Sequence, residues 1–420
     1  MSSFDDVQNR FGAADQGSLR RTNLALVLGR LRDQGPRSRA RLATELGITR
    51  SGVSSLVGEL VERGLVRTGV VERGAVGRPG TSVRLDGRSV CGIGAEINVH
   101  HVATMAMDLS GNVVAEHRLT LDGNRHEASE VVDRLVELVS RTEDDVAAHG
   151  AAPVGLTVGV AGLVDSTRDM LTLGPNLEWR EVPVGAMIRD RLQPDYPVVI
   201  DNEGNLAAIA ETLPGDPGRR DILVIFGEVG LGGGIVADGR LLRGRQGYAG
   251  EFGHMIVDPQ GRRCGCGRIG CWETVAGLRA LLDAAADTDD AVRDPALGLQ
   301  ARLAELNRRA DLGDTRTLAA LDQVGGWIGV GAAMLTNALN PAAIVLSGYF
   351  AEVGHHMRGS IEARLEAGVL APHAGGTVVE LSTLGFTAAV RGGATLALES
   401  VFADPTRVER LVPVAQGESR

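Results

Sequence analysis

The residues with the clearest chemistry are one histidine and three cysteines that lie close together in the sequence. His254 is followed by Cys264, Cys266 and Cys271, so three of the four cysteines in this 420-residue chain fall within eight residues. Thiolates with one imidazole favour tetrahedral Zn²⁺, and four protein ligands leave no open position, as in structural zinc sites. A disulfide is the alternative, but the added histidine and a reducing cytoplasm count against it. We therefore predict a structural zinc site.

The chain around these ligands alternates between strands and helices. A strand, a glycine-containing turn and a second strand occur in residues 91–121 and again in residues 222–242. This duplication predicts an α/β fold of the actin and hexokinase type (ribonuclease H-like), in which two lobes enclose a ligand. We place the hinge between the lobes near residues 200–220. His100 and His101 have no partner spacing, so we assign them a structural role.

The N-terminal part differs from this body in charge. Residues 20–88 carry 14 Arg against six acidic residues, a net charge of +8, whereas the whole chain carries −10. A basic module on an acidic body indicates a polyanionic partner for the module. No apolar run approaches the roughly 20 residues of a membrane span. The polar start also lacks a secretory signal, so we expect a cytoplasmic protein with no membrane partner.

The basic module has the pattern of a winged helix-turn-helix. Apolar residues recur with helical spacing from Leu24 to Leu31, and Ser38 and Thr49 are placed to cap two further helices on either side of Gly47. Two short helices joined by a glycine-containing turn place the second helix in the major groove of DNA. Strands at 65–67 and 82–85 with a glycine-rich tip at 74–80 predict the wing. A helical module that contacts only protein is the alternative.

The predicted DNA contacts are small or cationic. A close approach to the duplex needs such side chains at the start of the second helix, and an arginine in the wing tip can enter an A·T minor groove. The predicted set is Arg39, Arg50, Ser51, Ser54, Ser55 and Arg78. Helix-turn-helix proteins bind paired half-sites, so we also predict a homodimer or homotetramer.

The chain resembles the ROK family, which groups repressors, open reading frames and sugar kinases. The resemblance runs from about Leu19 to Leu398, and its most specific pieces are the segments 250–254 (GEFGH) and 264–273 (CGCGRIGCWE). It implies domains at 19–88 (winged helix-turn-helix) and 89–400 (sugar-binding, kinase-like), between tails at 1–18 and 401–420. With the N-terminal DNA-binding module, it implies a sugar-responsive transcriptional regulator, most simply a repressor of operator DNA.

The resemblance also implies the sugar contacts. Family members bind a monosaccharide effector or substrate through residues that correspond here to Asn202, Glu203, Glu251, His254 and Glu273. Carboxylates and an amide can donate to and accept from vicinal hydroxyls, and His254 would join the zinc to the sugar site. Surface roles for Glu251 and Glu273 are the alternative.

Two departures from the family pattern concern catalysis. The kinases begin their first phosphate loop with Asp-x-Gly-x-Thr, where this chain has Glu96-Ile-Asn98-Val-His100, and their second loop has Gly-Thr-Gly, where it has Glu228-Val229-Gly230. A carboxylate beside the phosphates repels ATP. Glu203 takes the place of the kinases' general-base aspartate, displaced by one methylene. We therefore expect no catalytic residue, and an ATP-dependent sugar kinase with an appended DNA-binding domain is the alternative.

Overall fold

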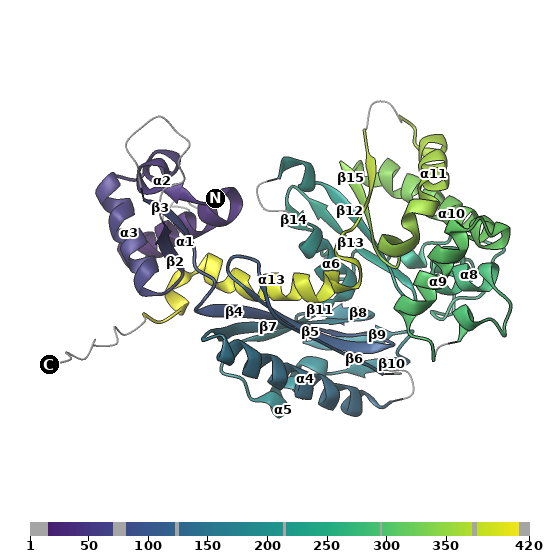
Figure 1. Ribbon diagram of the computed structural model, residues 1–420, viewed down its shortest axis with the longest axis horizontal. Helices are drawn as coiled ribbons and strands as arrows, with labels where there is room; N and C mark the ends of the chain where they lie inside the picture. Colours follow the sequence, from purple (N-terminus) through teal and green to yellow (C-terminus); the bar gives the residue numbers. More distant parts are fainter. Residues whose placement is uncertain are drawn as a thin grey trace, which may run out of the picture.

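The computed structural model describes residues 16–69, 81–121, 126–212, 216–294, 296–371 and 376–410. It consists of an N-terminal helical head and a body of two lobes, and helix α13 runs from the body to the head (Figure 1). The wing tip and Arg78 lie outside the described residues, as do residues 1–15 and 411–420.

The head is the predicted helix-turn-helix. Its helices are α1 (Gln16–Gln34), α2 (Arg39–Leu46) and α3 (Arg50–Glu62), and its small sheet contains β1 (Arg37–Ser38), β2 (Val66–Gly69) and β3 (Ser82–Leu85). The side chain of Ser38 accepts a hydrogen bond from the Arg41 N–H, and Thr49 caps α3 through the Gly52 N–H. Gly47 ends α2 with φ at 67°, a left-handed conformation that glycine adopts without strain. Local capping chemistry therefore sets the geometry of the turn.

The body contains the same sheet twice. In the first lobe the strand order is β11-β7-β4-β5-β6, and in the second it is β14-β13-β12-β15-β16. In each sheet three consecutive strands form an antiparallel meander, a later strand pairs in parallel with the first of them, and one more strand pairs in parallel with that later strand. The predicted duplication is confirmed. The strands are β4 (Val90–Ile97), β5 (His101–Asp108), β6 (Val113–Thr120), β7 (Ala152–Val160), β11 (Val198–Asn202), β12 (Ile222–Gly227), β13 (Leu231–Ala237), β14 (Arg240–Leu241), β15 (Ala343–Gly348) and β16 (Val378–Leu381).

Two helices lie between the sheets. Helix α13 (Ala388–Ala403) packs on β4 and β7, and α6 (Glu203–Glu211) packs against both α13 and β13. The backbones of β4 and α13 approach closely at Gly94, where a Cβ atom would lie 1.8 Å from the Val390 carbonyl oxygen. Helices α4 (Ala128–Ala148) and α5 (Val184–Leu192) lie along the other side of the first sheet (Figure 1). A small sheet of β8 (Leu163–Asp165), β9 (Met170–Gly174) and β10 (Trp179–Val182) extends this lobe.

The second lobe is completed by helices α7 (Glu273–Ala276), α8 (Leu278–Ala285), α9 (Leu299–Asp311), α10 (Thr315–Leu339) and α11 (Phe350–Gly368). Helix α10 is long and apolar enough, by length and composition, to cross a membrane. Its buried residues Leu321, Val324 and Ile328 belong to the core of this lobe, where α10 packs against α8 and α11. It is therefore a core helix of the fold.

The head and the body share one hydrophobic cluster. Leu398, Val401 and Phe402 of α13 are buried together with Leu24 and Leu28 of α1. The Arg32 guanidinium lies 4.6 Å from the centre of the Phe402 ring and forms an ion pair with Glu399.

The chain beyond α13 extends this contact. Residues 401–403 complete the helix, and a 3-10 turn at Pro405–Arg407 follows. The Arg63 guanidinium, at the end of α3, donates to the Val408 carbonyl at 2.5 Å. The described part of the predicted C-terminal tail, residues 401–410, is therefore folded against the head. Likewise α1 begins at Gln16, inside the predicted N-terminal tail.

Candidate functional site

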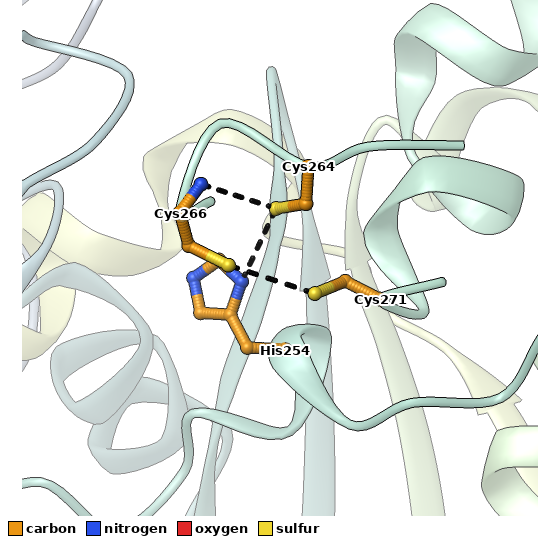
Figure 2. Close-up of side chains that lie close together, drawn as sticks. All are labelled: His254, Cys264, Cys266 and Cys271. Carbon is orange, nitrogen blue, oxygen red and sulfur yellow. Dashed lines mark hydrogen bonds between the residues drawn. The ribbon is translucent and has the colours of Figure 1, made fainter. Parts of the chain in front are cut away.

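The predicted metal ligands lie together in the second lobe. One ligand atom from each of His254, Cys264, Cys266 and Cys271 can be chosen so that all lie within 4.8 Å of one another, as the close-up shows (Figure 2). The Cys266 and Cys271 sulfurs are 3.6 Å apart, and Cys264 Sγ is 3.7 Å from His254 Nδ1.

These separations fit a metal site better than a disulfide. A disulfide would bring the Cys266 and Cys271 sulfurs to about 2.05 Å. Zinc–sulfur bonds of about 2.3 Å at the tetrahedral angle place two sulfurs roughly 3.7 Å apart. All four cysteines are free, with Cys91 buried in β4 away from this site. The spacing of the Cys₃His set is compatible with a structural zinc.

The loop that carries the ligands is fixed to the lobe by Trp272. This side chain is fully buried, and its indole N–H donates to the Trp327 carbonyl of α10 at 2.8 Å. It packs so tightly on α10 that a Cβ atom at Gly331 would lie 2.2 Å from the indole ring. Glu273 follows directly at the start of α7, so the anchor fixes this carboxylate as well.

Three predicted sugar contacts lie at the predicted metal site. The Glu273 carboxylate accepts a hydrogen bond from the Cys264 thiol at 2.7 Å and lies 3.6 Å from His254 Nδ1. Because Nδ1 faces the cysteines, Nε2 is the His254 nitrogen left for another ligand. Burial, with a contribution from the Glu273 charge, raises the pKa of Glu251 to about 7. Glu251, His254 and Glu273 thus form one polar group.

Asn202 and Glu203 lie where β11 meets α6. Asn202 caps α6: its Oδ1 accepts from the N–H groups of Gly204 and Asn205, and its Nδ2 donates to the Gly162 carbonyl at 2.9 Å. The second N–H of that amide is not used by these bonds. Burial, then the charges of neighbouring glutamates including Glu251, raises the pKa of Glu203 well above its usual value. The structure therefore brings the predicted sugar residues into one region.

The phosphate-loop positions contain a carboxylate cluster that sequence reasoning did not assemble. Glu96, Glu203 and Glu228 present oxygens within 4.8 Å of one another. Asn98 Nδ2 lies within hydrogen-bond distance of all three carboxylates. His101, predicted to be only structural, lies 3.5 Å from both Glu96 and Glu228. The register of the β4–β5 hairpin, which places His101 beside Asn98, is the signal that could have indicated this contact.

The predicted DNA contacts occupy one end of the head. Arg50, Ser51, Ser54 and Ser55 are exposed on the first turns of α3, and Arg39 begins α2. Neither Arg39 nor Arg50 has an ion pair with another residue in the described ranges, whereas the nearby Arg41 pairs with Glu45. Arg20 of α1 donates to Ser55 and is a neighbour that the sequence did not indicate.

Comparison with known proteins agrees with this arrangement. A helix-turn-helix head on a duplicated sugar-kinase fold defines a DNA-binding regulator built on a kinase scaffold. Sequence models described as ROK family and MarR family match residues 92–400 and 25–75, respectively. The chain belongs to the ROK family.

Individual relatives include regulators and kinases. The xylose repressor of Bacillus spizizenii is 28% identical, over 92% of this chain and 97% of its own length. A solved ROK family transcriptional regulator, described as a homolog of the E. coli MLC protein, has a TM-score of 0.72 at 24% identity, over 92% of this chain and 97% of its own. A ROK family glucokinase from Streptomyces griseus, solved with glucose and AMPPNP, has a TM-score of 0.63 at 30% identity, over 74% of this chain and 99% of its own.

Proposed function

We propose that the protein is a sugar-responsive transcriptional repressor that binds operator DNA through α3 and a monosaccharide between its lobes, without transferring phosphate from ATP. The observation that carries this proposal is the shared core of the head and α13. Helix α13 lies between the lobes and ends against α1, so a change in the lobes reaches the head through a packed helix. The relative named a xylose repressor, similar over nearly its whole length, supports the same function.

The sugar side of the proposal rests on the polar group around Glu251. Glu251, Glu273 and His254 Nε2 supply acceptors and donors for vicinal hydroxyls, with the unused N–H of Asn202 nearby. Zn²⁺ would be held by His254, Cys264, Cys266 and Cys271. When bound, it supplies no catalysis but fixes the His254 ring and the loop that carries Glu273.

The carboxylate cluster is the reason to propose a loss of phosphate transfer. Glu96 and Glu228 are 0% and 4% exposed, and Asn98 fills the space between them and Glu203. These are the phosphate-loop positions of the family's kinases. ATP phosphates would meet buried carboxylates there. The Thr hydroxyls that the kinases have in these loops are missing from this chain.

A sugar kinase with an appended DNA-binding head is the second candidate. The similarity to the Streptomyces griseus glucokinase favours it, as does the Glu203 carboxylate at the position of the kinases' base. The Asn98 amide, however, donates to the Glu203 carboxylate at 2.7 Å, and this bond opposes proton abstraction by that oxygen.

The same proposal includes the setting in which the protein acts. A protein that binds operator DNA and keeps its thiols reduced would act in the cytoplasm. Paired half-sites require a homodimer or homotetramer. Met334 and Leu339 of α10 are exposed apolar side chains that suit such a contact.

The test combines sugar binding with an assay for phosphate transfer. Isothermal titration of the zinc-loaded protein with a panel of monosaccharides should show one ligand that binds without nucleotide, and Glu251→Gln should weaken it at least about tenfold. The matched control is Glu137→Gln, an exposed change on α4. Sugar-dependent ATP consumption by the unmodified protein would favour the kinase instead.

A further inference from the structure

Three carboxylates from both lobes meet in one buried place. Glu96 belongs to β4 of the first lobe, Glu228 follows β12 of the second, and Glu203 begins α6 between them. Their oxygens lie within 4.8 Å of one another. Buried carboxylates are rare unless a cation, a proton or several donors compensate them, so the compensation here has to be identified.

Asn98 compensates the cluster only in part. Its Nδ2 lies 2.9 Å from Glu96 Oε1, 2.7 Å from Glu203 Oε2 and 2.5 Å from Glu228 Oε2. An amide nitrogen carries two hydrogens, so it can donate well to only two of these three oxygens. The Val99 N–H donates to Asn98 Oδ1 at 2.7 Å and fixes which end of the amide faces the cluster.

His101 provides an observation that is independent of the acidic residues. Its side chain is 1% exposed, and Nε2 has no hydrogen-bond partner among the described residues although it lies 3.5 Å from Glu96 Oε2. Its Nδ1 lies 3.1 Å from Arg118 Nη2. Within the described ranges the facing oxygens Glu96 Oε2 and Glu228 Oε1 also have no hydrogen-bond partner.

The donors around the cluster satisfy its carboxylates only weakly. Arg118 Nη2 lies 3.1 Å from His101 Nδ1, and the imidazole nitrogens lie 3.5 Å from Glu96 Oε2 and Glu228 Oε1, which is long for a hydrogen bond. The electropositive amide nitrogen of Asn98 lies where the three carboxylates converge. A cation at that position would satisfy the oxygens more completely than two amide hydrogens can.

We propose that Glu96, Glu203 and Glu228 bind a divalent cation of the oxygen-preferring class, Mg²⁺, Mn²⁺ or Ca²⁺, in the absence of nucleotide. Carboxylate oxygens with no thiolate favour these ions over zinc. The Asn98 side chain rotates away or offers its oxygen when the ion binds. Because the ligands come from both lobes, the ion ties the lobes together and favours their closed arrangement.

Protons are the competing ligand. Burial raises the pKa of Glu228 to about 7, and burial with the neighbouring carboxylates raises that of Glu203. Binding of the cation therefore releases protons, and its affinity should increase between pH 6 and 8.

The experiment measures Mn²⁺ binding to the full-length, zinc-loaded, nucleotide-free protein by electron paramagnetic resonance, with Ca²⁺ and Mg²⁺ as competitors. We expect one Mn²⁺ site per chain with a dissociation constant below about 1 mM. The double variant Glu96→Gln/Glu228→Gln should weaken binding at least about tenfold. Glu137→Gln on the surface of α4 is the matched control and should bind as the unmodified protein does.

A second variant keeps the test decisive if the double variant does not fold. Asn98→Asp replaces the amide by a fourth carboxylate, which should tighten Mn²⁺ binding about tenfold or more because ligand charge sets affinity in oxygen sites. No Mn²⁺ bound at 1 mM in the unmodified protein would overturn the proposal. Binding that Glu96→Gln/Glu228→Gln and Asn98→Asp both leave unchanged would also overturn it, since the ion would then lie elsewhere.

Discussion

Arg63 is the residue whose removal should separate the head from the body. It is 9% exposed at the end of α3, where it donates to Glu59 within the head and to the Val408 carbonyl beyond α13. Arg63→Ala removes a charged donor from a part-buried carbonyl and one of the cations that face the buried Glu59 carboxylate. The bond to the Val408 carbonyl joins the head to the chain beyond α13, and a hydrogen bond to a charged group contributes about 1.5–3 kcal/mol, so docking of the head should weaken by about that amount.

Hydrogen exchange measures this loss directly. Local opening of the head should become roughly 10- to 150-fold more frequent in Arg63→Ala, the equivalent of about 1.5–3 kcal/mol. Peptides from residues 16–69 and 400–410 should therefore lose protection, while those from β12 and β15 should not. The variant should still bind sugar, but the sugar should change its DNA affinity less.

The matched control is Arg134→Ala, which breaks an exposed pair with Glu137 on α4 and should change stability by less than about 1 kcal/mol. If Arg63→Ala keeps the protection of the unmodified protein and its full response to sugar, the reasoning about the shared core is wrong.

Three further changes test other parts of the account. Cys266→Ser should lose zinc and bind sugar about 10- to 100-fold more weakly, whereas the control Cys91→Ala should retain zinc. Metal analysis measures the zinc, and titration calorimetry measures the sugar affinity. Full sugar affinity without zinc would contradict the supporting role of the metal. Val229→Thr restores the kinase hydroxyl but leaves Glu228 in place, so it should show no sugar-dependent ATP turnover, and measurable turnover would favour the kinase. Because the pKa of Glu228 is raised from 4.5 to about 7 by burial, the folded state keeps a proton that the unfolded state loses, and stability should fall as the pH rises through that range. Urea unfolding in a calcium chelator should show this fall reduced in Glu228→Gln, and an unchanged fall would show that other groups cause it.

The sequence was most informative where structure depends on neighbouring residues. Ser38, Gly47 and Thr49 set the caps and the turn of the head through contacts within three or four residues. The predicted zinc ligands are equally local, since Cys264, Cys266 and Cys271 lie on one loop. Predictions of this kind depend on short-range chemistry, and the structure reproduces their geometry.

Contacts between distant segments could not be predicted in the same way. Asn98 and Glu203 are more than 100 residues apart in the sequence. The resemblance to the kinase loops placed these residues and Glu228 near one ligand. It could not show that the Asn98 amide lies between three carboxylates. Arg63 and Val408 are joined across almost the whole chain, in a segment whose polar, irregular sequence predicted only a tail. Both contacts are consequences of the tertiary fold.

The most direct test of the central claim is fluorescence anisotropy of DNA from the protein's own upstream region at fixed salt, titrated with and without each monosaccharide and no ATP. We predict tight binding that one sugar weakens, together with weaker binding by Arg50→Ala and not by Arg134→Ala. Binding no tighter than to random DNA, or tight binding that no sugar alters, would contradict the claim that this protein is a sugar-responsive repressor of that region.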